Sequence, residues 1–368
     1  MPSETALLHA LSLIPGIGSQ TIRDMVAHLG SASAVWETDE KTLLTINGLG
    51  PKTVAALITG RRTIDPDKEW ESITKQKVEI LAYTNKTYPR LLKEIPDAPA
   101  LLYVRGKYAW QDKPLIAIVG SRTFTNYGEQ AAHRFATDLA AAGYIVVSGL
   151  AFGIDSIAHK AALEAYAETL AVLGSGVDDA SISPQSHLPL AKAVMNAGAL
   201  ISEYRPGTKA NEGTFPARDR IIAGMTVGTV VIEAPEKSGA LITARHALDY
   251  NREVFAIPGS IFAPSSFGTN ALIKAGAKIV TSVQDILEEF PLSDGVSAAK
   301  ADASRIDNAS LSQEEKKILT LLSHEPIHVD KIVKASTLGT SSASSALSLL
   351  EIKGFARNVG GMNYIRMN

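Results

Sequence analysis

The sequence is informative first for what it lacks. None of its 368 residues is cysteine, which excludes disulfides, cysteine-based zinc sites and a cysteine nucleophile. No apolar run is long enough to cross a membrane as a helix, so no membrane span is expected. Positive charge is not in excess, because 36 Lys and Arg stand against 38 Asp and Glu, a formal net charge of -2. This balance excludes blanket attraction to nucleic acid, so any such binding must depend on local clusters.

Targeting signals are also scarce. The N-terminus has no basic region, and His9 and Pro15 interrupt its apolar stretch, which is unlike a secretory signal peptide. With 45% hydrophobic and 20% charged residues, the composition is that of folded globular domains. We therefore expect a soluble, cytoplasmic protein.

The length and the changes of composition along the chain predict three domains and one linker. Residues 1–66 alternate apolar helical stretches with glycine-containing turns, whereas residues 67–290 alternate short strands with helices. Residues 291–309 are small and polar, which is typical of a flexible linker. Residues 310–368 then form a small amphipathic domain. None of the three domains is strongly basic.

A short motif occurs twice in the first domain. Leu13-Ile-Pro-Gly-Ile-Gly18 recurs as Thr45-Ile-Asn-Gly-Leu-Gly50, with helical patterns on both sides of each copy. This is a helix-hairpin-helix signature, in which glycines allow a tight turn and the apolar residue between them fills the helix pair. Amides at the start of the following helix can hold a DNA phosphate. Few cations flank the turns, so DNA binding and a structural or protein-binding role both stay open.

The middle domain predicts a Rossmann-like, doubly wound and mainly parallel sheet. Apolar β-branched runs alternate with Ala-rich helical stretches, which is typical of a parallel sheet covered on both faces. The expected strands are residues 115–119, 144–148, 170–173, 200–202, 227–234 and 253–258. Each strand ends in small residues, so a ligand site is expected at the carboxyl edge of the sheet.

This edge lacks the signatures of common nucleotide enzymes. G-x-G-x-x-G is missing after the first strand, and neither G-x-x-x-x-G-K-[ST] nor G-x-S-x-G is present. Small residues and arginines suit an anion instead, because helix amides and planar guanidinium groups both match phosphate oxygens. The candidate residues are Ser121, Arg122, Ser148, Gly149, Gly153, Lys209, Arg218, Arg220 and Arg245. A phosphodiester backbone, a mononucleotide and free phosphate are all candidate ligands.

Some acidic residues near this edge have both a catalytic and a structural interpretation. Asp155 and His159 could form an acid–base pair, but a helix N-cap and a histidine hydrogen-bonded to the sheet edge is the favoured interpretation. Glu203 and Glu233 stand at strand ends and could act as general bases. Partnering the nearby arginines explains these two glutamates equally well.

The last domain predicts a winged helix. Three helices are expected at residues 313–323, 328–335 and 341–353, followed by two strands within residues 354–366. In such domains the third helix can enter the major groove of DNA. Here that helix carries almost no cations, so DNA reading and a protein contact both stay open.

One match in this domain is misleading. His324-Glu-Pro-Ile-His328 fits the zinc motif H-E-x-x-H literally. That motif requires an unbroken helix to place both histidines on one face, and Pro326 would break the helix. No metal site is therefore expected.

About nine ordered blocks of the middle domain resemble the DNA-processing protein A (DprA, also called Smf) family. They include Ile118–Arg122 with Tyr127-Gly128, Ser148–Asp155 with Ala158-His159, Leu200–Glu203, Phe215–Ile222, Val231–Glu233, Ser238–Thr243, Val254–Gly259 and Gly268–Asn270. The C-terminal winged helix is similar to the small domain that many family members carry.

The resemblance implies a function that composition does not show. Members of the family bind single-stranded DNA, protect incoming DNA during natural transformation of competent cells, and load RecA recombinase onto it. They form homodimers through the Rossmann-like domain, use no cofactor and are not enzymes. A single-stranded DNA-binding protein is a further candidate partner.

The resemblance also implies the site. Carried over to matching positions, the DNA-binding residues are Gly120, Ser121, Arg122, Ser148, Gly149, Gly153, Phe215, Arg218 and Arg220. Lys209 is added for its charge alone.

One departure from the family pattern matters. Asp219 lies between two arginines where the family usually has asparagine, and its negative charge is expected to weaken the binding of DNA.

The alternative function is a nucleotide-binding Rossmann-like enzyme of the phosphoribohydrolase type. That family has a P-G-G-x-G-T pattern, which Pro258-Gly-Ser-Ile-Phe262 does not match.

Overall fold

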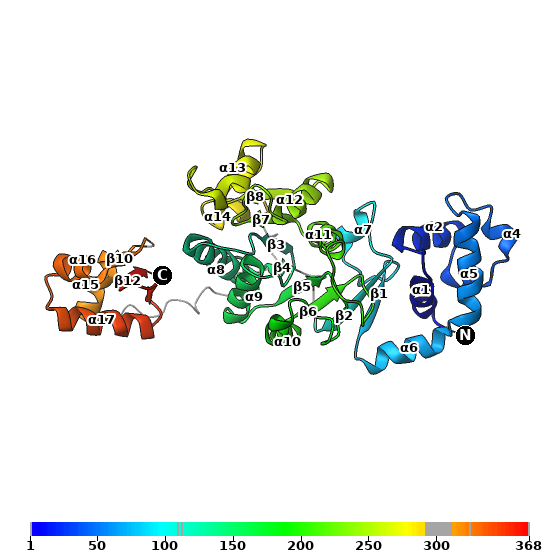
Figure 1. Ribbon diagram of the computed structural model, residues 1–368, viewed down its shortest axis with the longest axis horizontal. Helices are drawn as coiled ribbons and strands as arrows, with labels where there is room; N and C mark the ends of the chain where they lie inside the picture. Colours follow the sequence, from blue (N-terminus) through cyan, green and yellow to red (C-terminus); the bar gives the residue numbers. More distant parts are fainter. Residues whose placement is uncertain (1, 109, 112, 291–310, 324, 367–368) are drawn as a thin grey trace. The chain divides into compact units, whose positions relative to one another are not determined.

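A computed structural model describes residues 2–108, 110–111, 113–290, 311–323 and 325–366. The chain forms two compact units, residues 1–297 and 298–368. The first unit contains the N-terminal helices and a nine-stranded sheet, and the second contains a small fold of helices and three strands (Figure 1).

The N-terminal helices form the two predicted hairpins. These helices are α1 (Glu4–Ser12), α2 (Ser19–Leu29), α3 (Ala32–Glu37), α4 (Glu40–Leu43) and α5 (Pro51–Thr63). The repeated motif makes the turns between α1 and α2 and between α4 and α5, where Gly16 and Gly48 have φ angles of +82° and +86°. Ile17 and Leu49, the apolar residues between the glycines, are buried. The helix-hairpin-helix fold is therefore confirmed.

The sheet confirms the predicted Rossmann-like topology and extends it. Its strands are β1 (Glu79–Ala82), β2 (Leu101–Gly106), β3 (Leu115–Val119), β4 (Ile145–Ser148), β5 (Thr169–Leu173), β6 (Ala199–Ser202), β7 (Gly228–Val231), β8 (Glu253–Ala256) and β9 (Lys278–Ile279). Their order is β1-β2-β6-β5-β4-β3-β7-β8-β9, and neighbours from β6 to β9 are parallel. Strands β1 and β2, outside the predicted set, add an antiparallel edge.

Helices cover both faces of the sheet. The remaining helices of this unit are α6 (Pro66–Lys75), α7 (Arg90–Glu94), α8 (Asn126–Ala141), α9 (Ile154–Glu164), α10 (Leu188–Ala197), α11 (Thr214–Met225), α12 (Ala240–Asp249), α13 (Phe267–Lys274) and α14 (Gln284–Leu287), with short 3-10 turns at Gln185–His187 and Pro264–Ser266. Ile116 and Ile118 of β3 share a core with α8 and α9. Ala117 and Val119 of the same strand share a second core with α11 and α12. This alternation follows from the two-residue repeat of a strand.

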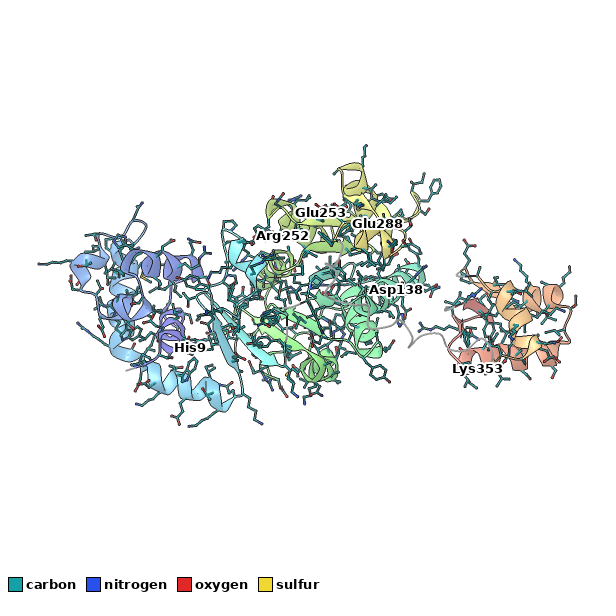
Figure 2. The ribbon with its side chains drawn as sticks, turned by 180° about the vertical axis from the view of Figure 1, so that it is seen from behind. His9, Asp138, Arg252, Glu253, Glu288 and Lys353 are labelled. Atoms are coloured by element: carbon teal, nitrogen blue, oxygen red, sulfur yellow. The ribbon has the colours of Figure 1, made fainter. Side chains whose placement is uncertain are left out.

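The N-terminal helices share a hydrophobic core with the β1–β2 end of the sheet. Leu7 and Leu11 of α1 belong to the same buried cluster as Ile80 and Tyr103 of these strands. His9, labelled in Figure 2, also joins them, because its Nδ1 lies 2.8 Å from the Tyr103 hydroxyl. Burial, with a smaller contribution from the charge of Arg205, lowers the pKa of His9 to about 4.

This shared core bears on the predicted boundary at residue 66. The boundary falls at the first residue of α6, which leads from the hairpins into the sheet. The hairpins and the sheet nevertheless belong to one compact unit. Cutting the chain at this boundary would expose the core between them.

The second unit has the predicted winged-helix fold. Its elements are α15 (Gln313–Leu321), β10 (Ile327–His328), α16 (Val329–Ser336), α17 (Thr340–Ile352), β11 (Ala356–Asn358) and β12 (Asn363–Arg366). The three strands form an antiparallel sheet in the order β10-β12-β11. Lys353, after α17, forms an ion pair of 2.7 Å with Glu315 at the start of α15.

The misleading zinc motif lies in this unit. His328 ends β10 and caps the N-terminus of α16, so it does not lie within a helix as a zinc-binding H-E-x-x-H would require. His324 lies outside the described residues. Across the described parts of both units, no group of three or more His, Asp or Glu is arranged to hold a metal. Within the same ranges, no helix is both long and apolar enough to span a membrane.

Candidate functional site

A cavity of about 510 Å³ opens where the loops after β3, β4 and β7 meet the start of α11. Parallel strands bring their carboxyl ends to one edge, so residues far apart in the sequence converge there. Of the predicted site residues, Gly120, Ser121, Arg122, Phe215 and Arg218 line the cavity. Ser148, Gly149, Gly153, Lys209, Arg220 and Arg245 are not among its lining residues.

Arg122 is the predicted cation best placed to meet a ligand. Its side chain is exposed at the cavity, and its guanidinium carbon lies 5.2 Å from the centre of the Phe215 ring. Within the described part of the chain it makes no hydrogen bond or ion pair, so all its N–H groups are open to an incoming acceptor. A guanidinium held above a ring offers both a phosphate contact and an aromatic surface.

Ser121 supports this arginine from within the loop. Its hydroxyl donates to the Thr123 carbonyl oxygen at 2.5 Å and accepts from the Thr123 amide at 3.1 Å. The Ser121 amide donates to the carbonyl oxygen of Glu233, and its own carbonyl accepts from the Ile154 amide. The Ser121 side chain and amide are therefore occupied internally, and the residue fixes the loop that presents Arg122.

The loop after β4 is also held from within. The Ser148 hydroxyl donates to the Ile118 carbonyl oxygen at 2.7 Å and is fully buried. The amides of Gly149 and Ala151 donate to one oxygen of Asp155, at 3.1 and 3.4 Å. Gly153 has a φ of +79°, and a Cβ there would overlap the Ser121 carbonyl oxygen. These residues shape the edge instead of offering free groups to a ligand.

Arg218 has a different position from the one expected. Only 5% of the residue is exposed, and its Nη1 donates to the carbonyl oxygens of Gly149 and Val172. Its Nε donates to Asp219 at 3.0 Å. The guanidinium therefore joins the ends of β4 and β5 from inside the cavity wall. A direct contact with DNA stays a prediction, and it would require Arg218 to give up these internal bonds.

Two buried carboxyl groups accompany Arg218. Burial raises the pKa of Asp219 to about 6, although the adjacent Arg218 opposes the shift. Burial also raises the pKa of Asp155, again against the attraction of Arg218. Asp219 thus pairs with a buried arginine, Arg218, inside the cavity wall.

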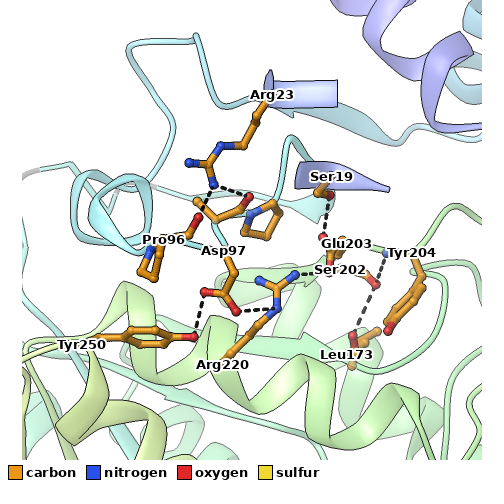
Figure 3. Close-up of polar contacts among 12 residues, drawn as sticks. Ser19, Arg23, Pro96, Asp97, Leu173, Ser202, Glu203, Tyr204, Arg220 and Tyr250 are labelled. Carbon is orange, nitrogen blue, oxygen red and sulfur yellow. Dashed lines mark hydrogen bonds and ion pairs between the residues drawn. The ribbon is translucent and has the colours of Figure 1, made fainter. Parts of the chain in front are cut away.

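Arg220 lies at the junction of the sheet and the first hairpin (Figure 3). Its Nη2 donates to Glu203 at 2.6 Å, and its Nε lies 3.6 Å from Asp97. Glu203 also accepts from the hydroxyl of Ser19, the first residue of α2. In the same view, Tyr250 donates to Asp97 at 2.8 Å. Arg220 is therefore committed to an internal network that ties α2 to the core.

The residues with a possible acid–base role all have structural roles in the fold. Asp155 lies in the first turn of α9 and accepts from loop amides, so it is not the N-cap residue, which is Gly153. His159 is buried and bonds Thr169 of the central strand β5 at 2.7 Å. Among the described residues Glu233 pairs with no arginine, and its carboxylate accepts from the amide and hydroxyl of Thr125. The arginine partnership holds for Glu203 alone.

Some cavity residues were missed by sequence reasoning. Lys237, Ser238, Gly239 and Thr243 line the side formed by the loop after β7 and the start of α12. The block Ser238–Thr243 is one of those that resemble the DprA family, and this resemblance could have identified these residues as part of the site. Lys209 and Arg245, the latter on α12, are exposed, but neither of them lines the cavity.

Fold and site together define a Rossmann-like α/β protein with a winged-helix unit and an arginine–aromatic cavity at its sheet edge. Residues 79–291 match the family model for DNA recombination-mediator protein A, and residues 301–362 match the DprA winged helix domain. The chain therefore belongs to the DNA recombination-mediator protein A (DprA/Smf) family, whose role is in DNA processing and recombination.

Individual relatives agree with this assignment. Protein Smf of Synechocystis sp. is 32% identical over 396 residues, which cover 99% of each chain. The DNA processing protein DprA of Bacillus subtilis is 41% identical over 218 residues, covering 59% of this chain and 73% of the relative.

Two solved structures share the fold. That of DNA processing protein A from Streptococcus pneumoniae has a TM-score of 0.71 and 34% identity, covering 80% of this chain and all of that one. A structure of DNA processing protein A from Helicobacter pylori, described by its single-stranded DNA binding mode, has a TM-score of 0.52 and 28% identity. It covers 58% of this chain and 95% of that one.

Proposed function

We propose that the protein binds single-stranded DNA without sequence preference at the carboxyl edge of its sheet. The observation that carries this proposal is the exposed Arg122 over the ring of Phe215 at the cavity. Guanidinium groups bind phosphate oxygens, and aromatic rings stack on any base, so the pair suits an unpaired strand. Similarity to the Helicobacter pylori protein supports the choice of single-stranded DNA as the ligand.

The predicted site residues divide between contact and support. Arg122 and Phe215 contact the strand, and Lys209 contributes charge along its path. Gly120, Ser121, Ser148, Gly149 and Gly153 shape the loops, and Arg218 braces the loop after β4 from inside. Arg220 instead ties α2 to the core through Glu203. Because Asp219 pairs with Arg218, its negative charge lowers the positive potential at Arg122 less than the sequence suggested.

The binding role serves recombination in this proposal. The protein protects incoming single strands in the cytoplasm and loads RecA recombinase onto them during natural transformation. It works as a homodimer through the Rossmann-like domain, with a single-stranded DNA-binding protein as a further partner. Family membership supports these roles. Light scattering should give twice the chain mass, and immobilised RecA should retain both the full chain and a chain ending at Phe290.

The proposal is one of binding without catalysis. The two buried acids at the cavity, Asp155 and Asp219, are occupied by loop amides and by Arg218, which accounts for both without a catalytic role. A phosphoribohydrolase would release free base from nucleoside monophosphates. Chromatography after incubation with each monophosphate should show no base, and its release would favour the enzymatic alternative.

The central test is the replacement of Arg122 by Ala. Affinity for oligothymidylate should fall about tenfold, because a charged contact to phosphate is lost. The slope of log K against log salt should also shrink by about 0.7, the value of one phosphate contact on a single strand. Fluorescence anisotropy at several salt concentrations measures both quantities.

Arg134→Ala is the matched control for this test. Arg134 is exposed on α8, where it lies 3.7 Å from Asp138 within one helix. Its loss removes the same charge from the chain without touching the edge, so affinity and slope should stay near those of the wild type. Equal losses in both variants would indicate a nonspecific charge effect and overturn the assignment of the site.

A further inference from the structure

Phe152 is an exposed ring in a loop that is otherwise mostly buried. Half of the residue, 50%, is exposed, whereas Leu150 and Gly153 on either side are buried. The loop that carries it is fixed by bonds from the Gly149 and Ala151 amides to Asp155. The exposure of the ring is thus a property of a well-anchored loop.

A histidine from a different segment holds this ring. His187 lies with its ring 4.8 Å from that of Phe152, at 70° between the planes. Its Nδ1 lies 2.9 Å from the Leu150 carbonyl oxygen, which can only accept, so Nδ1 carries the proton. The contact ties His187 to the very loop that carries Phe152. The ring is therefore supported from one side while half of its surface remains free.

Phe152 also lies next to the cavity. Ala151, the preceding residue, lines it, and the following Gly153 packs against the backbone of Ser121 and Arg122. Along the sheet edge, β4 lies between β3, which precedes Arg122, and β5. A strand held at Arg122 and running across the end of β4 toward β5 would meet Phe152.

A single exposed aromatic residue is common and needs no explanation by itself. Here three observations coincide: a fixed loop, a supporting ring and a position beside the proposed phosphate contact. We propose that Phe152, supported by His187, is a second stacking platform that binds an unpaired base beyond the nucleotide held at Arg122 and Phe215. This inference rests on the proposed function and adds a second base subsite to it.

The chain offers a matched control at the far end of the helix that follows Phe152. Tyr166 follows α9 and is 99% exposed, whereas Phe152 precedes that helix. The 11 residues of α9 between them span about 16 Å along the helix axis. Tyr166 therefore lies at the opposite end of α9 from the proposed strand path.

The first experiment measures affinity for oligothymidylate by anisotropy. Phe152→Ala should lower affinity by roughly fivefold to 100-fold, the range of one lost base–aromatic stack. The salt slope should stay unchanged, because no charge is removed. Phe152→Trp should keep near wild-type affinity, and Tyr166→Ala should have no effect. Circular dichroism melting should show that Phe152→Ala remains folded.

The second experiment reports on stacking directly. Phe152→Trp and Tyr166→Trp each add one tryptophan to the three already present. Oligothymidylate should quench the added emission of the first variant, because its indole stacks on a base, and leave that of the second unchanged.

The outcomes separate this inference from the proposed function. If Phe152→Ala binds as tightly as the wild type while Arg122→Ala binds weakly, the second platform is wrong and the binding edge stands. If the wild type itself fails to bind oligothymidylate, the proposed function fails. A Phe152→Ala variant with unchanged DNA affinity but altered mass in light scattering would assign the ring to a protein contact instead.

Discussion

Arg122 and Arg218 come from two equally recognisable blocks of the sequence, yet the fold uses them in opposite ways. Arg122 stands exposed over Phe215 without an internal hydrogen bond or ion pair in the described residues. Arg218 lies in the wall of the same cavity, bonded to two carbonyl oxygens and one carboxylate. A motif thus identifies which residues gather at a site, but burial and partners decide which of them remain free for a ligand.

The difference follows from the positions of the two residues. Arg122 follows the end of β3 on a loop, where its side chain extends into solvent. Arg218 lies within α11, whose packing against the sheet turns that side chain toward the ends of β4 and β5. Removing the first should cost binding, and removing the second should cost stability.

Arg218→Ala should have the largest effect on the free energy of unfolding. It leaves buried carbonyl oxygens and the Asp219 carboxyl without their partner, which costs about 3–5 kcal/mol. Urea denaturation followed by circular dichroism measures the change. A loss below 1 kcal/mol would mean that Arg218 is not the internal brace described above.

Arg220→Ala should have the next largest effect, about 1.5–3 kcal/mol, because it breaks charged hydrogen bonds that are only partly exposed. Since Glu203 also holds Ser19, the loss should loosen the first hairpin before the rest of the unit. Hydrogen exchange of α2 should therefore rise more than that of α9. Equal exchange in both helices would contradict the predicted coupling.

Asp219→Asn should change how stability depends on pH. The pKa of Asp219 rises from 3.8 to about 6 on folding, so the folded chain holds its proton where the unfolded chain has lost it. The stability that this group contributes is full below about pH 4 and is lost as pH rises through about 6. Asparagine does not titrate, so the variant should gain on the wild type by about 1 kcal/mol or more between pH 4 and 7.

Urea titrations at fixed pH values test this prediction. The asparagine can still accept from Arg218, so the comparison isolates the charge. A difference between the two proteins that stays constant from pH 4 to 7 would show that Asp219 titrates normally.

Arg122→Ala should have the smallest effect on stability, within about 0.5 kcal/mol of the wild type, because its guanidinium has no internal polar partner among the described residues. The same urea experiment measures it. A large destabilisation would place Arg122 with Arg218 as a structural residue and remove the contrast between them.

The sequence predicted the central strands and the sheet edge, because long apolar runs ending in small residues leave little choice of fold. Strands β1 and β2 were outside the prediction. They pair antiparallel at the edge next to β6, outside the run of parallel strands that the pattern predicts. The two hairpin turns were predictable from glycine spacing alone.

The free or buried state of each arginine was not predictable. Arg218 and Arg220 lie two residues apart on one helix, which places them on different sides of α11. Their partners come from Gly149, Glu203 and Asp97, residues brought close only by the complete fold. The support of Phe152 by His187 likewise joins two segments that no local pattern connects.

The packing of Gly149 against Arg218 also limits which substitutions these two positions tolerate. A Cβ on Gly149 would overlap the Arg218 guanidinium, so the absence of a side chain at Gly149 leaves room for that of Arg218. Gly128 stands in the same relation to the carboxylate of Glu233. Within each pair, a larger residue at the glycine would displace the charged end group of its partner from the hydrogen bonds that it makes there. Across the family, a larger residue at either of these glycine positions should therefore be accompanied by a change at its partner.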